Sequence, residues 1–231
     1  MTPCQGELSE EGAEDGGVAL EAISRRERSG SPLPKSRAKS RDLARVRYAE
    51  VTPAGYMAKH VQKPKGFNID QVTDVYSVSS CVNDDFADYI NFWKHNGYWL
   101  FDSPEIIRAV ARENSISIEG TSLFFYEVHQ TQFDGESWAP FEPDRSFETN
   151  VLLPPAKAMD GFDVVTFHAG NAPEHSPLSC NNLARVIRTN VHCLFDSFDE
   201  AYASLTNGKF NHCEPGPYRI FAVYSTPWPS S

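Results

Sequence analysis

The sequence lacks the short motifs that bind nucleotides or build common hydrolytic sites. It contains neither GxGxxG nor GxxxxGK[ST], the glycine-rich loops whose backbone N–H groups bind phosphates. The patterns GxSxG, HExxH and CxxC are absent as well. We therefore expect no cofactor, and the absence of these motifs favours a protein that is not an enzyme.

Long apolar runs and a dense set of cysteines are also missing. No stretch approaches the roughly 18 apolar residues of a transmembrane helix, and the mean hydropathy is -0.44. The N-terminus carries Glu and Gly where an export signal has a basic start and an apolar stretch. Five cysteines in 231 residues are too few for a disulfide scaffold. These features predict a cytoplasmic protein with no membrane partner.

The net charge of the chain is -10, and each part of the chain has few charges of one of the two signs. Residues 1–22 hold six acids and no base, whereas residues 25–47 hold nine bases and two acids. The first forty residues have no aromatic side chain, so they cannot bury enough apolar area to offset the entropy lost on ordering. We expect 1–47 to be a disordered tail and 48–231 a single domain. The change of character just before Met57 leaves open that translation starts there.

The basic segment 25–47 is compatible with weak binding of nucleic acid. No aromatic side chain is interleaved with its bases, so stacking on single strands is unsupported. Residues 48–231 carry 23 acids and 12 bases, and this excess of negative charge repels nucleic acid. We therefore expect nucleic acid to bind at most weakly, through this segment, and a solvated tail without a partner is the favoured alternative.

Hydrophobic periodicity predicts an α+β domain with a mixed, largely antiparallel sheet of five to six strands and about four helices. We expect helices over 83–97 and 178–190, one that begins at Ser103-Pro104, and one that follows Ser197 and ends at Asn207-Gly208. We detect no internal repeat. The expected strands are 72–80, 98–101, 122–130, 147–153, 162–167 and 218–225.

An enzyme remains an alternative, namely a hydrolase or transferase of unfamiliar type that uses a Cys/His/carboxylate cluster. Cys81 follows an expected strand and precedes a helix N-terminus, which lowers the pKa of a thiol. His95 or His129 is then the candidate base, oriented by Asp102 or Glu127.

A small zinc-supported domain is a further alternative. His175, Cys180, Cys193 and Cys213 are the candidate ligands, because zinc prefers four ligands of these types. Their spacing is irregular, and free cysteine is often simply buried. We therefore favour no metal.

A binding surface is the interpretation that we favour. Trp138 lies in a polar, proline-rich segment with Phe141 and Arg145, and these three residues are the candidate recognition surface, although Trp138 also suits the edge of the core. The polar side of the expected helix 83–97 adds three carboxylates: Asp84, Asp85 and Asp88. The leading hypothesis is a non-catalytic protein-interaction module of inhibitor, immunity or adaptor type, whose acidic domain binds a basic protein partner.

Overall fold

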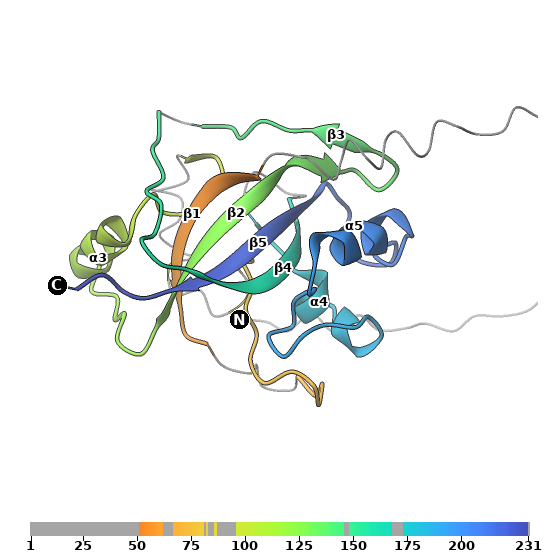
Figure 1. Cartoon of the computed structure of the whole chain (residues 1–231), viewed down its shortest axis with the longest axis horizontal. Coiled ribbons are helices and arrows are strands. Elements are labelled where there is room, and N and C mark those ends of the chain that lie inside the picture. The colour runs from red at the N-terminus through yellow and green to blue at the C-terminus, as the bar shows by residue number, and fades with distance from the viewer. Residues whose placement is uncertain are drawn as a thin grey trace, which may run out of the picture. The chain divides into compact units, whose positions relative to one another are not determined.

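A five-stranded antiparallel sheet forms the centre of the structure (Figure 1). The computed structural model describes residues 51–61, 67–80, 82, 86, 96–145, 148–167 and 173–230, all within the unit Lys39–Ser231. The strand order is β1-β2-β5-β4, and β3 pairs with β2. This arrangement confirms the predicted α+β class and antiparallel sheet. The strands are β1 (Val51–Lys59), β2 (Ser122–Phe133), β3 (Trp138–Pro140), β4 (Ala158–Thr166) and β5 (Tyr218–Thr226).

The described helices are short, and their starts follow local rules. They are α3 (Pro104–Glu113), α4 (Pro177–Cys180), α5 (Phe198–Thr206) and a 3-10 turn, η2 (Leu183–Arg185). The hydroxyls of Ser103 and Ser197 cap α3 and α5 by accepting hydrogen bonds from backbone N–H groups in the first turn, as predicted. None of the helices in the described ranges has the length and apolar character needed to cross a membrane.

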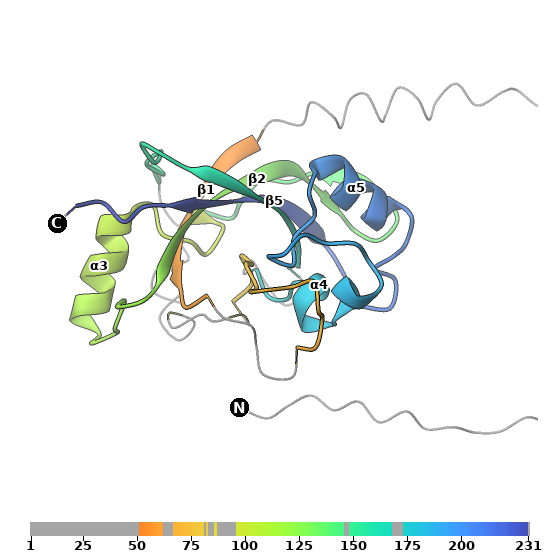
Figure 2. The ribbon, with the colours of Figure 1, turned by 60° about the horizontal axis from the view of Figure 1, so that its bottom comes forward.

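The segment predicted as a strand over 72–80 is irregular, and this prediction was wrong. Polar groups of this segment bind a buried carboxylate and not a neighbouring strand. Asp163 accepts hydrogen bonds from the Ser77 hydroxyl at 2.6 Å and from the Val78 backbone N–H at 3.1 Å. These bonds hold the segment against the face of the sheet on which α4 also lies (Figure 2).

Three other sequence-based assignments need correction. Residues 98–101 form bends, with a single bridge from Phe101 to Tyr56, and the described residues of 147–153 form no strand. The helix expected over 178–190 is divided into α4 and η2. The predicted tail 1–47 and nearly all of the predicted helix 83–97 lie outside the described residues.

β1 escaped prediction, because Pro53 and Gly55 interrupt its apolar pattern. Residues 51–56 already pair with β2, so a chain that began at Met57 would lack more than half of this strand.

The structure contains an internal repeat that the sequence analysis did not detect. Residues 96–103 read NGYWLFDS and residues 190–197 read NVHCLFDS. Each copy lies between an edge strand and a capped helix, so the first repeat runs β1–α3–β2 and the second runs β4–α5–β5. In both copies the asparagine side chain binds an edge strand, through Asn96 Nδ2 to the carbonyl of Ala54 at 2.9 Å and Asn190 Nδ2 to the carbonyl of Asp160 at 2.7 Å.

A glycine at the same position in each edge strand permits this contact. Gly55 has a φ of 133° and Gly161 has a φ of 147°. A Cβ atom on either would lie 2.7 Å from a turn carbonyl, that of Phe101 for Gly55 and that of Phe195 for Gly161. Only glycine allows strand and turn to approach so closely with this backbone conformation.

The two repeats are related by an approximate two-fold axis perpendicular to the sheet. Gly55 lies opposite Tyr126 in β2, and Gly161 lies opposite Val223 in β5. Tyr126 and Val223 are themselves opposite each other in the central β2–β5 pair. Rotation about an axis through this pair therefore exchanges β1 with β4 and β2 with β5, and it gives residues of the paired strands, the turns and the helix starts counterparts in the other repeat.

Replacement of Gly161 tests the close contact between edge strand and turn. Gly161→Ala should lower the free energy of unfolding by about 3 kcal/mol or more, because the new methyl group meets backbone at an unfavourable φ. Gly120→Ala is the matched control: its φ is 75° but no atom lies within 4 Å of the added Cβ, so we expect a loss of about 1 kcal/mol. Urea denaturation measures both. Equal losses would contradict the importance of the contact.

Candidate functional site

The face of the sheet opposite Asp163 bears a groove of about 510 Å³, here called the β-face groove. Residues directly opposite each other in an antiparallel sheet project to the same face, and Glu127, Ala222 and Phe162 form such a row. Val51, at the start of β1, also lines the groove. Other side chains that line the groove include His129, Met159, Phe198, Asp199 and Tyr224.

A lysine held by a carboxylate and an aromatic ring lies beside the groove. Lys157 Nζ is 2.5 Å from Glu127 Oε1 and 3.8 Å from the centre of the Tyr224 ring. The Tyr224 hydroxyl donates to Glu127 Oε2 at 2.7 Å, and burial followed by this carboxylate raises the pKa of Tyr224. This side of the sheet therefore already binds one ammonium group by charge and by an aromatic face.

His129 is the one side chain of the groove with polar atoms that are buried and unsatisfied. It is 8% exposed, and its ring stacks on Phe198 with 3.9 Å between centres. Neither ring nitrogen has a hydrogen-bond partner among the described residues. Burial lowers the pKa of His129 from its usual 6.5 to about 4, although the nearby Glu127 opposes the shift. The imidazole is therefore neutral at pH 7 in the folded protein.

His129 should make the fold less stable in acid. Its folded-state pKa lies below its unfolded value, so stability is lost as pH falls from about 6.5 to about 4. His129→Phe keeps an aromatic ring against Phe198 and removes this loss, which amounts to about 3 kcal/mol. Unfolding measured at pH 7 and pH 4 should show the variant gaining relative to the wild type. If the wild type and the variant lost the same stability between pH 7 and pH 4, this result would contradict a neutral, buried imidazole.

The structure brings together two of the five residues proposed as catalytic. Glu127 and His129 line the β-face groove, whereas Asp102 belongs to the repeated motif, where its carboxylate accepts a hydrogen bond from Asn96 Nδ2 at 3.2 Å. Cys81 and His95 lie outside the described residues. Among the residues that are described, none forms a nucleophile–base hydrogen bond with the His129 ring. Ser197, which also lines the groove, uses its hydroxyl to cap α5.

Asp163 is a buried acid on the opposite face, and its contacts are structural. Besides Ser77 and Val78, the Ser176 hydroxyl donates to it at 2.6 Å. Burial raises the pKa of Asp163 to about 6, against the hydrogen bonds from the two serines and Val78. The carboxyl group thus ties segment 67–80 and the start of α4 to β4.

Asp163→Asn should change the pH dependence of stability in the opposite sense to His129→Phe. The native carboxyl binds its proton more tightly than the unfolded one, so stability falls as pH rises from about 4 to about 6. The variant keeps hydrogen-bonding groups and lacks this loss of about 3 kcal/mol. Denaturation at pH 4 and pH 7 should show the variant less affected by the higher pH. An unchanged difference between the two proteins at both pH values would refute the assignment.

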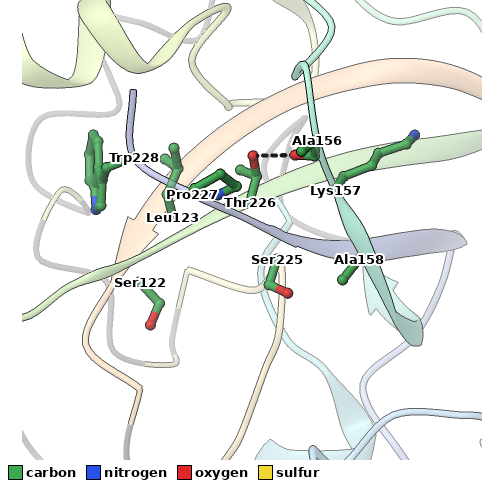
Figure 3. A pocket seen from close by; sticks show the side chains of 9 residues that line it. All are labelled: Ser122, Leu123, Ala156, Lys157, Ala158, Ser225, Thr226, Pro227 and Trp228. Atoms are coloured by element: carbon green, nitrogen blue, oxygen red, sulfur yellow. Dashed lines mark hydrogen bonds between the residues drawn. The ribbon is translucent and has the colours of Figure 1, made fainter. Parts of the chain in front are cut away.

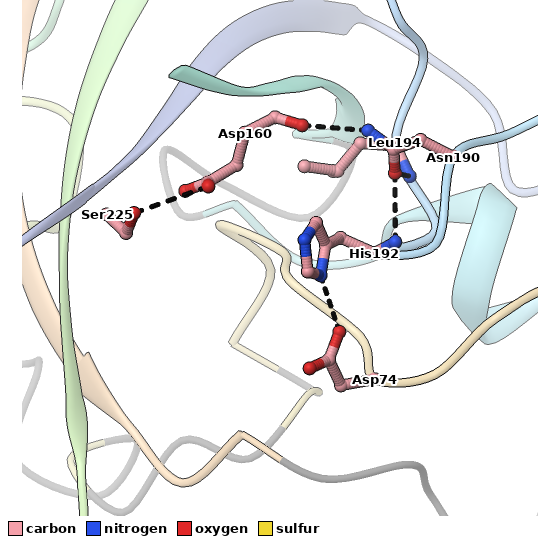
Figure 4. A network of polar contacts seen from close by, with 6 residues as sticks. All are labelled: Asp74, Asp160, Asn190, His192, Leu194 and Ser225. Carbon is pink, nitrogen blue, oxygen red and sulfur yellow. Dashed lines mark hydrogen bonds and ion pairs between the residues drawn. The ribbon is translucent and has the colours of Figure 1, made fainter. Parts of the chain in front are cut away.

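A second His–carboxylate pair joins segment 67–80 to the turn of the second repeat (Figure 4). His192 Nδ1 lies 2.5 Å from Asp74 Oδ1, and Tyr76 stacks on the imidazole at 4.0 Å. Cys193 follows directly, but burial raises the pKa of its thiol to about 12, so it is a poor nucleophile. This pair therefore fixes the turn from which α5 begins.

The candidate metal ligands do not converge. Among the described residues, no three His, Cys, Asp or Glu side chains lie close enough together to hold a metal ion. Cys193 and Cys213 are free thiols. The residues proposed for zinc therefore provide no metal centre in the described part of the chain.

The proposed recognition residues pack against separate partners. The ring of Trp138, in β3, stacks on Tyr202 at 4.5 Å, while the Phe141 ring lies 3.8 Å from the guanidinium of Arg219. Arg145 is exposed. Trp138 and Phe141 each cover part of the core, and Asp84, Asp85 and Asp88 lie outside the described residues.

A second pocket, also of about 510 Å³, lies on the other side of Lys157 (Figure 3). The Thr226 hydroxyl donates to the carbonyl of Ala156 at 2.8 Å there, and Trp228 Nε1 donates to the carbonyl of Thr121 at 3.2 Å. The described residues that line this second pocket include no carboxylate. The β-face groove, with Glu127 and Asp199, is therefore the better candidate for recognition.

Comparison of the chain with protein-family models, with curated proteins and with solved structures found no match. Functional inference therefore depends on the site itself.

Sequence reasoning missed most of the groove. Phe162, Phe198 and Tyr224 look like core residues in the sequence, and they become groove residues only because five elements meet there. The signal that could have found the site is the repeated LFDS, which places the starts of two helices at equivalent positions beside the sheet.

Proposed function

We propose that the protein is a non-catalytic binding protein whose β-face groove takes a basic segment of a protein partner. The observation that carries this proposal is the combination of carboxylates with aromatic faces in the groove, namely Glu127 and Asp199 with Phe162, Phe198 and Tyr224. Lysine and arginine side chains bind to such combinations, because charge and the face of the ring both attract a cation.

The charge of the whole domain supports the same partner. The described residues contain nineteen Asp and Glu but nine Lys and Arg. A negative potential of this kind speeds the association of basic partners and suppresses the binding of nucleic acid. The contact of Lys157 with Glu127 and Tyr224 is an example, within the chain, of the recognition that we propose.

The cytoplasm is the compartment that we propose for this activity. Cys193 and Cys213 are free thiols, which suits a reducing environment.

A charge reversal in the groove tests the proposal. The probe is a fluorescent ten-residue peptide of alternating arginine and valine, and anisotropy measures its binding to the full chain. Asp199→Lys should weaken binding about tenfold at low salt, because the groove loses a carboxylate and gains a repelling ammonium group. Binding by the wild-type protein should also weaken as salt rises.

Glu105→Lys provides the matched control. Glu105 is the counterpart of Asp199, in the first turn of α3, and it is exposed and outside the groove. The reversal changes net charge and helix electrostatics equally, yet it should leave probe affinity within about twofold. An equal loss in both variants, or binding that is insensitive to salt, would refute the groove as the site.

A further inference from the structure

The described chain enters the sheet at the β-face groove. Val51 is both the first residue of β1 and part of the groove lining. The residues immediately before it, 41–50, read RDLARVRYAE and belong to the same unit of the chain, Lys39–Ser231. A segment that precedes β1 therefore begins beside the groove, whatever path it takes.

The second repeat shows how such a segment can lie on the sheet. Residues 150–156 precede β4 and cross the sheet from the side of β1 (Figure 1). The Leu152 N–H donates to the carbonyl of Asp102 at 3.0 Å, and the Tyr56 hydroxyl donates to the carbonyl of Leu152 at 2.6 Å. Thr226 then holds Ala156, as Figure 3 shows. The segment is thus held by hydrogen bonds at Leu152 and at Ala156.

The two-fold relation predicts which residues would make the equivalent contacts in the groove. Counting back from the equivalent glycines, Leu152 corresponds to Val46 and Ala156 corresponds to Glu50. The motif makes Asp196 the counterpart of Asp102. His129 is the counterpart of Thr226, because each lies three positions after its member of the central pair, Tyr126 or Val223.

We propose that residues 44–50 lie in the β-face groove as the counterpart of residues 150–156, and that a partner must displace them. Only the second half of this statement rests on the proposed function.

Two polar groups at the groove lack hydrogen-bond partners among the described residues, and this segment can supply them. The carbonyl of Asp196 accepts no hydrogen bond from the described residues, whereas its counterpart Asp102 binds Leu152. The ring nitrogens of His129 have no partner in the described part of the chain, whereas its counterpart Thr226 donates to Ala156. A docked segment supplies both missing partners, through the N–H of Val46 and the carbonyl of Glu50, and the second of these removes the cost of an unsatisfied buried donor.

The charges of the segment and of the nearby helix start also match for residues 44–50, whereas they do not for residues 150–156. Arg45 and Arg47 stand where the crossing segment of the second repeat has Val151 and Leu153. The first turn of α5 carries two acids that can pair with such arginines, Asp199 and Glu200. The first turn of α3 contains one acid, Glu105.

The proposed docking is weaker than its counterpart by one hydrogen bond. Phe162 replaces Tyr56, so the donor that binds Leu152 has no equivalent. A segment held by fewer bonds can be displaced, and it lowers the affinity of any competing basic ligand by the fraction of time that it occupies the groove.

Photo-cross-linking in the full chain tests the docking directly. With p-benzoylphenylalanine in place of Tyr48, irradiation should produce intramolecular cross-links to Met159 or to the groove residues Phe162 and Phe198, identified by peptide mapping. The control places the same group at Leu33, from which we expect no cross-link to the groove. Absence of groove cross-links from position 48, equal cross-links from position 33, or a cross-linked dimer would overturn the proposal.

A binding measurement tests the regulatory half. Arg45→Glu/Arg47→Glu should raise affinity for the arginine–valine probe about fivefold or more by freeing the groove, beyond the effect of Arg25→Glu/Arg26→Glu, which makes the same change in net charge. Equal effects would overturn displacement. Cross-links without any probe binding would leave docking intact and refute the proposed function, whereas probe binding without cross-links would do the reverse.

Discussion

The fold depends on the contact between each edge strand and the turn that precedes its helix. Gly55 and Gly161 let the turn backbone approach within a distance that no other residue tolerates, and Asn96 and Asn190 bind the strand carbonyls from the turn. Because the helix begins directly after the turn, this contact also fixes where the helix start lies relative to the sheet. The rim of the β-face groove is thus a consequence of a backbone contact and not of side-chain packing alone.

Local signals predicted the elements whose stability is local. Serine caps identified α3 and α5, and continuous apolar runs identified β2 and β5. β1 was missed because Pro53 and Gly55 break its pattern, and those residues serve the contact with a turn far along the sequence. The segment 72–80 has the alternation of a strand, but its polar groups bind Asp163. No window of the sequence contains both partners of such interactions.

The groove was predictable in its parts and not as a whole. His129 was proposed as a catalytic base and Glu127 as the acid that orients it, since a sequence cannot show that no nucleophile among the described residues bonds to His129. The two repeats then differ in one respect that matters for binding. Tyr56 and Asp102 of the first repeat bind the segment that precedes β4. Among the described residues, their counterparts Phe162 and Asp196 bind no such segment, and His129 of β2 has no hydrogen-bond partner.

The approximate two-fold axis has a consequence for how this architecture can be assembled. One repeat alone has a central strand with an unpaired edge, and a second copy of the same repeat, rotated by half a turn, would cover that edge with an identical strand. The strands and turns of the chain are therefore arranged as two copies of one repeat would be if they were joined end to end. Joining removes the need for the two halves to stay identical, so the clefts beside the two helix starts are free to acquire different side chains and different bonding to the segments that enter them.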